Sequence, residues 1–166
     1  MQLETTGPRI FVSLAESKVV CAIHRETGET VDFARLDGCS NNFPMALDED
    51  GRRLFLVARS PPCLLVLCAD TGRLVARVPC GADSDDVFYD ARRRAVYIVC
   101  GEGVVGVVLR APSPQGGDEG YSATEEVPTA VGARTGLWLP DRGRLVVAAP
   151  ATAAVPARLL VLEAHF

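Results

Sequence analysis

The chain has 166 residues, of which 48% are hydrophobic and 23% are charged, and its formal net charge is −4. This composition excludes an intrinsically disordered protein and is sufficient for one globular domain with a sizeable core. It also excludes a basic nucleic-acid surface, because the one basic run, at residues 92–94, falls in an expected turn.

The first residues carry no recognisable targeting signal. Residues 1–6 lack the basic region followed by an apolar region that defines a signal peptide, and no stretch reaches the roughly 20 apolar residues of a membrane span. We therefore expect no membrane span. The compartment stays open: a complete chain would be cytoplasmic, and a piece of an exported protein would be periplasmic or secreted.

Short apolar runs recur from the beginning of the chain. In the first copy, strands are expected at residues 3–5, 9–14, 19–23 and 31–36. In the second copy, they are expected at residues 45–48, 53–58, 63–67 and 74–78. The third strand of each copy is followed by a Thr-Gly turn, and Thr71-Gly72 follows Thr27-Gly28 by 44 residues. Gly and acidic residues supply the backbone angles that tight hairpins need.

Two further copies follow. The third has expected strands at residues 87–90 and 95–99, and the fourth at residues 137–140, 144–149 and 157–162. Val96 follows Leu54 by 42 residues, and Leu145 follows Val96 by 49, the excess matching an inserted loop at residues 111–120. The last copy ends after its third strand.

A period near 42 residues with about four short strands per copy predicts an all-β protein, a β-propeller. Helical repeats of similar length are excluded because the apolar runs span five or six residues and are separated by Gly or Pro. We expect one propeller domain over residues 1–166, with three to four blades of four antiparallel strands and a last blade that lacks its outer strand. The approximate blades are residues 1–42, 43–85, 86–133 and 134–166.

The terminal blades each have an apolar face that needs a partner. Three arrangements are compatible with this: a C-terminal part of a larger ring, a small four-bladed ring, or two chains that complete one ring. We therefore expect self-association through exposed terminal blades in the last case.

The pattern Arg-Arg-Leu-Phe-Leu-Val at residues 52–57, then Leu-Leu-Val-Leu, Asp-Thr-Gly and Val-Ala-Arg-Val, resembles the bacterial YVTN-type propeller repeat, which is related in shape to WD40 and NHL propellers. Val96-Tyr97-Ile98-Val99 stands at the position of the tetrad that names the repeat, and matches it loosely. The resemblance covers nearly the whole chain. It implies a ring of six to eight blades, and relatives that include binding scaffolds, surface-layer proteins, lactonase-like enzymes and haem-binding domains.

Polar loop residues at one end of the blades form the candidate ligand site, because convergent polar groups on a rigid scaffold are the usual form of a binding site. The candidate residues are Asn41, Asn42, Arg59, Asp83, Asp85, Asp86, Glu102, Arg134 and Trp138. Asp and Asn at these positions also suit turns and strand ends, and Trp138 also suits the core. Both interpretations stay open at this stage.

The sequence favours a binding scaffold for a protein or small-molecule ligand over an enzyme. We expect no catalytic residues, no metal and no cofactor, because His24 and His165 lie outside any nucleophile or haem-attachment motif. The alternative is a lactonase- or lyase-like propeller with a metal at the channel mouth. The six cysteines show no zinc spacing and suit small buried positions, although a Cys39–Cys80 bridge is conceivable from their repeat positions.

Overall fold

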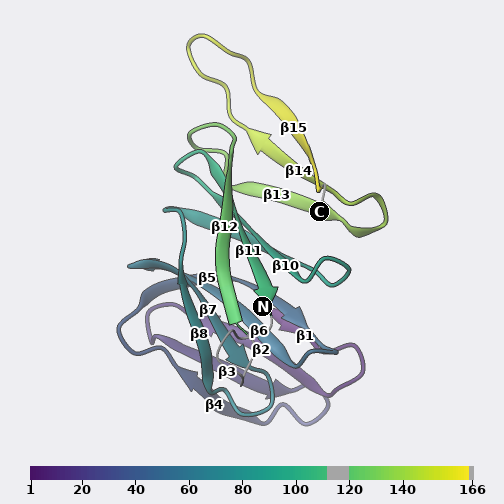
Figure 1. The fold of residues 1–166 in the computed structure, drawn as a ribbon. Helices are drawn as coiled ribbons and strands as arrows, with labels where there is room; N and C mark the ends of the chain where they lie inside the picture. Colours follow the sequence, from purple (N-terminus) through teal and green to yellow (C-terminus); the bar gives the residue numbers. More distant parts are fainter. Residues whose placement is uncertain (112–119, 165–166) are drawn as a thin grey trace. The chain divides into compact units, whose positions relative to one another are not determined.

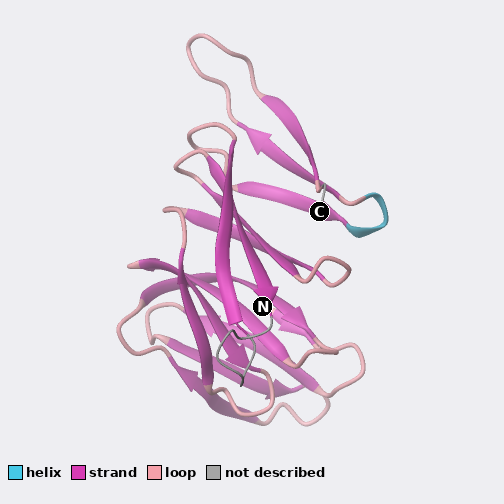
Figure 2. Cartoon of the chain, in the orientation of Figure 1, coloured by secondary structure: helices cyan, strands magenta, loops and turns pink. Residues whose placement is uncertain are grey.

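The computed structural model describes residues 1–111 and 120–164, and of Asn42 and Phe43 it describes the backbone. These residues belong to two compact units, Met1–Pro79 and Cys80–Phe166, which we describe one at a time. Apart from one 3₁₀ turn, η1 (Pro140–Arg142), the regular elements of the described ranges are β-strands (Figure 2). No helix in these ranges is long and apolar enough to cross a membrane.

Unit 1 contains two four-stranded antiparallel sheets, here called blade 1 and blade 2. Their strands are hydrogen-bonded in chain order, each to the next (Figure 1). Blade 1 comprises β1 (Gln2–Leu3), β2 (Arg9–Leu14), β3 (Val19–His24) and β4 (Thr30–Arg35). Blade 2 comprises β5 (Ser40–Asp48), β6 (Arg53–Ser60), β7 (Pro62–Cys68) and β8 (Leu74–Pro79).

Unit 2 contains blade 3, with four strands, and blade 4, with three. Blade 3 comprises β9 (Ser84–Asp90), β10 (Ala95–Cys100), β11 (Val104–Ala111) and β12 (Gly120–Pro128). Blade 4 comprises β13 (Thr135–Leu139), β14 (Arg144–Ala149) and β15 (Arg158–Glu163). Consecutive antiparallel strands joined by short hairpins are the construction of propeller blades.

The middle strands of blades 2 and 3 are mostly buried, and every residue of β10 is buried. Leu54, Leu56 and Leu65 of blade 2 pack with Phe11 and Val20 of blade 1 in the core of unit 1. In unit 2, side chains of β10 and β11 pack against Leu145 and Val147 of β14. The outer strands β4, β8 and β12 are mostly exposed. The apolar runs of the sequence are therefore explained by covered sheet faces, as in other stacked sheets.

The repeat extends to the backbone conformation of the turns. Between the first and second strands of successive blades, Arg52 (φ 53°), Arg94 (φ 56°) and Gly143 (φ 59°) all adopt left-handed geometry. A second series of left-handed residues lies where the chain enters the first strand of blades 2 to 4. It comprises Asn41, Asp83 and Gly132. Asn and Asp tolerate this region better than other non-glycine residues. The same turn is thus built in each of blades 2 to 4 even where the residue type changes.

Buried acidic residues close the first hairpin of blades 2 and 3. The Asp48 carboxylate accepts a hydrogen bond from the Gly51 amide at 2.9 Å, and the Asp90 carboxylate accepts one from the Arg92 amide at 3.0 Å. Such bonds from an Asp side chain to its own turn replace part of the missing backbone pairing. The acidic turns of the sequence therefore have a structural role in these two blades.

Candidate functional site

Five of the candidate residues lie together in unit 2. We call Asp83, Asp85, Asp86, Glu102 and Arg134 the acidic loop cluster. Arg134 Nη1 lies 2.8 Å from Asp83 Oδ2, and its Nε lies 3.2 Å from Asp85 Oδ2. Asp86 Oδ2 accepts a hydrogen bond from the Gly136 amide at 2.8 Å, which joins β9 to the start of β13. Glu102 is exposed in the hairpin between β10 and β11.

Backbone hydrogen bonds hold the three loops of the acidic loop cluster together. The Gly101 amide donates to the Asp83 carbonyl at 2.9 Å, and the Gly132 amide donates to the Gly101 carbonyl at 2.6 Å. A Cβ atom on Gly101 would lie 2.4 Å from Asp83 Oδ2 and 3.0 Å from the Asp83 carbonyl oxygen. The loops therefore approach this closely only because residue 101 is glycine.

The acidic loop cluster carries more negative than positive charge, with four carboxylates around one guanidinium. The side chains of Arg134, Asp83 and Asp85 are 47%, 41% and 39% exposed. Ion pairs exposed to this extent contribute about 0–1 kcal/mol to stability. The excess of carboxylates is thus placed where water and a ligand can reach it, and the fold depends little on it.

The candidate residues of unit 1 lie together at one end of blade 2. Asn41 Nδ2 lies 3.5 Å from Ser60 Oγ, and the Ser40 hydroxyl donates to the Ser60 carbonyl at 3.4 Å, so the entry to β5 meets the hairpin between β6 and β7. Arg59 is half-buried at the end of β6. The side chain of Asn42 lies outside the described residues.

Trp138 lies in a different environment, beside Tyr97 of β10. The centroids of the two rings are 4.9 Å apart and their planes are inclined by 46°. The indole Nε1 is buried and has no hydrogen-bond partner among residues 1–111 and 120–164. No hydrogen bond or ion pair joins Trp138 to the acidic loop cluster in the part of the chain that the structure describes.

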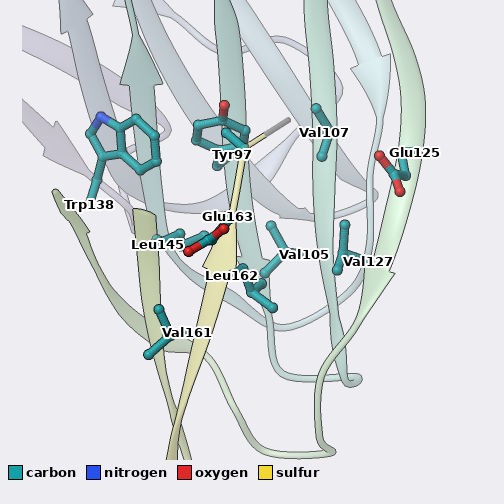
Figure 3. A pocket seen from close by; sticks show the side chains of 11 residues that line it. Tyr97, Val105, Val107, Glu125, Val127, Trp138, Leu145, Val161, Leu162 and Glu163 are labelled. Atoms are coloured by element: carbon teal, nitrogen blue, oxygen red, sulfur yellow. The ribbon is translucent and has the colours of Figure 1, made fainter. Parts of the chain in front are cut away.

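Both rings line a cavity of about 450 Å³ in unit 2, which the sequence did not reveal. Trp138 and Glu125 lie at opposite ends of it (Figure 3). Its walls are the side chains of Tyr97, Val105, Val107, Glu125, Val127, Trp138, Leu145, Val161, Leu162, Glu163 and Ala164. The wall is mainly apolar, as in most ligand cavities, with carboxylates at the rim.

Tyr97 connects this cavity to the hairpin of blade 3. Its hydroxyl lies 3.3 Å from Asp90 Oδ2, which also pairs with Arg93 Nη1 at 3.0 Å. Burial and the neighbouring Asp90 carboxylate raise the pKa of Tyr97 to about 12. A phenol whose pKa is raised in the folded protein stabilises the fold below its ordinary pKa of 10 and loses that contribution as the pH rises toward 12.

We expect an alkaline titration of the tyrosinate absorbance to show one group that titrates near pH 12, and Tyr97→Phe to remove that step. The free energy of unfolding of the wild-type chain should fall between pH 10 and 12, and the variant should lack this part of the fall. A variant that keeps the late step would show that the group is not Tyr97.

The histidine and cysteine side chains were the other candidates for chemistry in this sequence. His24 Nδ1 accepts a hydrogen bond from the Thr27 amide at 3.3 Å in the hairpin between β3 and β4, whereas His165 lies outside the described residues. All six cysteines are free thiols, so the conceivable Cys39–Cys80 bridge is absent. Within residues 1–111 and 120–164, no group of three His, Cys, Asp or Glu side chains is arranged to hold a metal ion.

Comparison with known proteins identifies the fold. No family model matches the chain, and no curated protein matches its sequence. Among solved structures, the chain is similar to hydrazine synthase from Kuenenia stuttgartiensis, with a TM-score of 0.77 and 13% identity over 95% of this chain and 43% of that one.

Two further solved structures match. The first is dihydro-haem d1 dehydrogenase NirN, with a TM-score of 0.57 and 13% identity over 95% of this chain and 35% of that one. The second is a putative 6-phosphogluconolactonase from Bacteroides uniformis, with a TM-score of 0.59 and 12% identity over 94% of this chain and 54% of that one. The chain thus spans roughly half or less of each of these three structures.

These likenesses and the blade topology confirm the fold class predicted from the sequence. The chain is an all-β protein of the β-propeller fold, and its described residues form three four-stranded blades and a blade of three strands. At these identities the likeness extends to the fold alone, because propellers of one shape perform unrelated functions.

Proposed function

We propose that this chain is a propeller scaffold that binds a positively charged group of a protein or small-molecule ligand through the acidic loop cluster of unit 2. We also assign its blades to the YVTN-type repeat, on the residues that carry the resemblance. The observation that carries the function is the geometry of the cluster: several half-exposed carboxylates surround the single guanidinium of Arg134.

Three features support a binding role. The carboxylates are attached to the ends of packed sheets, so little conformational entropy is lost when a ligand engages them. The loops are tied by backbone hydrogen bonds, which keeps the spacing of the charges fixed. The excess negative charge attracts a cation such as a lysine or arginine side chain, and this attraction weakens as salt is added.

The test uses a fluorescent tri-lysine peptide as the probe and the full chain as the receptor. The double variant Asp83→Asn, Asp85→Asn removes two charges and keeps the shape of the side chains, and Asn tolerates the left-handed backbone at residue 83 (φ 57°). The matched control is Asp141→Asn, an exposed aspartate in η1 of the same unit.

We expect the wild-type chain and the control to bind the probe equally, and the double variant to bind about tenfold more weakly. A tri-glutamate peptide should not bind. Equal affinity of all three proteins for tri-lysine would contradict the proposal, as would turnover of a lactone with a bound divalent metal by the purified protein, which would favour the enzymatic alternative.

A further inference from the structure

Two cysteine thiols are in direct contact inside unit 1. The Sγ atom of Cys39 lies 3.5 Å from the Sγ atom of Cys63, and each residue is 3% exposed. Cys39 immediately precedes β5, and Cys63 is the second residue of β7, in the same blade. We call these two residues the thiol pair. At this separation the two sulfur atoms touch, so no other group lies between them.

The fold does not require sulfur at these two positions. Asp83 of blade 3 follows the equivalent residue of blade 2, Asn41, by 42 residues, and both adopt the left-handed conformation. At the same spacing, the positions that correspond to the thiol pair are Gly81 and Val105. Blade 3 therefore forms its sheet without either thiol, and the chemistry of the thiol pair is a property particular to blade 2.

Cys39 lies on a tight turn close to the surface. Gly38 on one side of it (φ 70°) and Asn41 on the other (φ 54°) both have left-handed backbone geometry. Asp37 and Gly38 are exposed. Arg77 of β8 holds the turn, because its Nη2 donates to the Asp37 carbonyl at 2.8 Å. Cys39 is thus buried directly beneath exposed backbone, where a small local opening admits a small solute.

The two thiols have different surroundings. Burial, together with the hydrogen bond and the charge of Cys39, raises the pKa of Cys63 to about 12, and the opposing effect of Arg77 does not outweigh these causes. Cys63 therefore keeps its proton near neutral pH. Because the thiolate is the nucleophile in thiol chemistry, Cys39 beside the exposed turn is the residue of the pair that attacks first, and Cys63 reacts second.

The thiol pair needs little movement to become bonded. An S–S bond is about 2.0 Å long, so the two sulfur atoms must approach by about 1.5 Å. Cys63 is fixed by pairing on both sides of β7, with Ala58 of β6 and Pro79 of β8. Cys39 precedes β5 and is free of such pairing on its own strand. Rotation of the Cys39 side chain and a small shift of its turn therefore supply the approach.

We propose that Cys39 and Cys63 form a redox site, at which a small peroxide converts the thiol pair into a disulfide that fastens the entry of β5 to β7. With hydrogen peroxide, the Cys39 sulfur attacks one oxygen, the O–O bond breaks and Cys39 becomes a sulfenic acid. The hydroxide that leaves takes the Cys39 proton and becomes water.

The second step forms the disulfide. The Cys63 sulfur attacks the Cys39 sulfur, the S–O bond of the sulfenic acid breaks, and the hydroxide that leaves takes the Cys63 proton as a second water. Two thiols are oxidised to one disulfide, and one peroxide is reduced to two waters.

The bond would fix two loops that carry candidate ligand residues of unit 1. Asn41 follows Cys39 by two residues, and Ser60 precedes Cys63 by three. In the reduced chain the two loops meet through long hydrogen bonds, from Ser40 to the Ser60 carbonyl at 3.4 Å and from Asn41 to the Ser60 hydroxyl at 3.5 Å. A disulfide replaces this weak contact with a covalent one. The inference does not depend on the function proposed for the acidic loop cluster.

Peptide mapping of the full-length wild-type chain tests the proposal. The chain is treated with hydrogen peroxide, its remaining thiols are alkylated, and it is cleaved with trypsin. Cys39 then lies on the peptide of residues 36–52, and Cys63 lies on the peptide of residues 60–73 together with Cys68. We expect mass spectrometry to show these two peptides joined with the loss of two hydrogens, fragmentation to place the bond at Cys63, and dithiothreitol to separate them.

Two alanine variants separate the thiol pair from general oxidation. Cys63→Ala should abolish the joined peptides and leave Cys39 as a sulfenic acid that dimedone traps. The matched control is Cys68→Ala, because Cys68 belongs to the same strand and the same tryptic peptide but points to the other sheet face. This variant should form the joined peptides as the wild-type chain does.

Amide hydrogen exchange tests the effect on the loops, and exchange at residues 38–41 should be slower in the oxidised chain than in the reduced chain. Unjoined peptides after peroxide treatment, a bond to Cys68 in the wild-type chain, or unchanged exchange at these amides would each overturn the proposal. The map and the exchange are measured on the wild-type chain, so they decide the question even if a variant does not fold.

Discussion

Gly72→Ala is expected to lower the free energy of unfolding of unit 1 by about 3 kcal/mol. Gly72 lies in the hairpin between β7 and β8 with φ of 72°, a conformation that alanine adopts at a cost of about 1–2 kcal/mol. A Cβ atom would also lie 2.0 Å from the Phe33 carbonyl oxygen. Because that oxygen belongs to the backbone of β4, a strand must shift to relieve the contact, and such overpacking costs a further amount of about 1–3 kcal/mol.

The chain contains its own control for this substitution. Gly28 occupies the equivalent hairpin of blade 1 with φ of 73°, and a Cβ atom at that position would have no heavy atom within 4 Å. Gly28→Ala should therefore cost about 1 kcal/mol, the conformational part alone. Denaturant unfolding of the full chain measures both. Equal losses for the two variants would show that β8 and β4 do not approach as closely as the structure indicates.

The same pair of glycines shows what the sequence could predict. Thr27-Gly28 and Thr71-Gly72 are identical in sequence, and their repeat spacing predicted two equivalent hairpins, both of which the structure contains. Strand positions such as 95–99 were predictable for the same reason, because alternation and turn residues are local signals. The packing of Gly72 against Phe33 was not predictable, because it depends on which blade lies beside the hairpin.

The candidate site was predictable in the same limited sense. Matching repeat positions gave Asp83, Asp85 and Arg134, which the structure brings into contact. Repeat position did not predict the neighbour of Cys39. Its Sγ lies 3.5 Å from the Sγ of Cys63 in β7. Burial and the adjacent Cys39 thiol raise the pKa of Cys63 to about 12. The cavity was not predictable either, because its lining residues come from six strands of blades 3 and 4, and repeat positions alone do not show which side chains meet.

The second large effect is expected at Glu4, which the sequence suggested was part of a short strand stump. Glu4 is 1% exposed, and its carboxylate accepts hydrogen bonds from Arg9 Nε at 3.1 Å, Arg9 Nη2 at 2.6 Å and Arg52 Nη2 at 3.1 Å. Arg52 also contacts Asp70 at 2.6 Å, so the network joins blades 1 and 2 within unit 1. Glu4→Gln leaves two arginines facing a neutral amide and should cost about 2–3 kcal/mol, somewhat less than a fully buried pair because the arginines are partly exposed.

The pH dependence of stability distinguishes a charge effect from a packing effect at Glu4. Burial alone would raise the pKa of Glu4, but the hydrogen bonds from Arg9 and Arg52 outweigh it, and the pKa lies below the ordinary value of 4.5. A carboxylate whose pKa is lowered by folding stabilises the fold above that ordinary value and loses its contribution as the pH falls through its folded pKa.

The difference in unfolding free energy between the wild-type chain and Glu4→Gln should therefore be constant near neutral pH and shrink as the pH falls below 4.5. Glu16→Gln is the matched control, since Glu16 is exposed in the hairpin between β2 and β3, and it should change stability by less than about 0.5 kcal/mol at any pH. A Glu4→Gln deficit that persists unchanged in acid would mean that the side chain acts through shape and hydrogen bonding. The charge of Glu4 would then contribute nothing to the contact between blades 1 and 2.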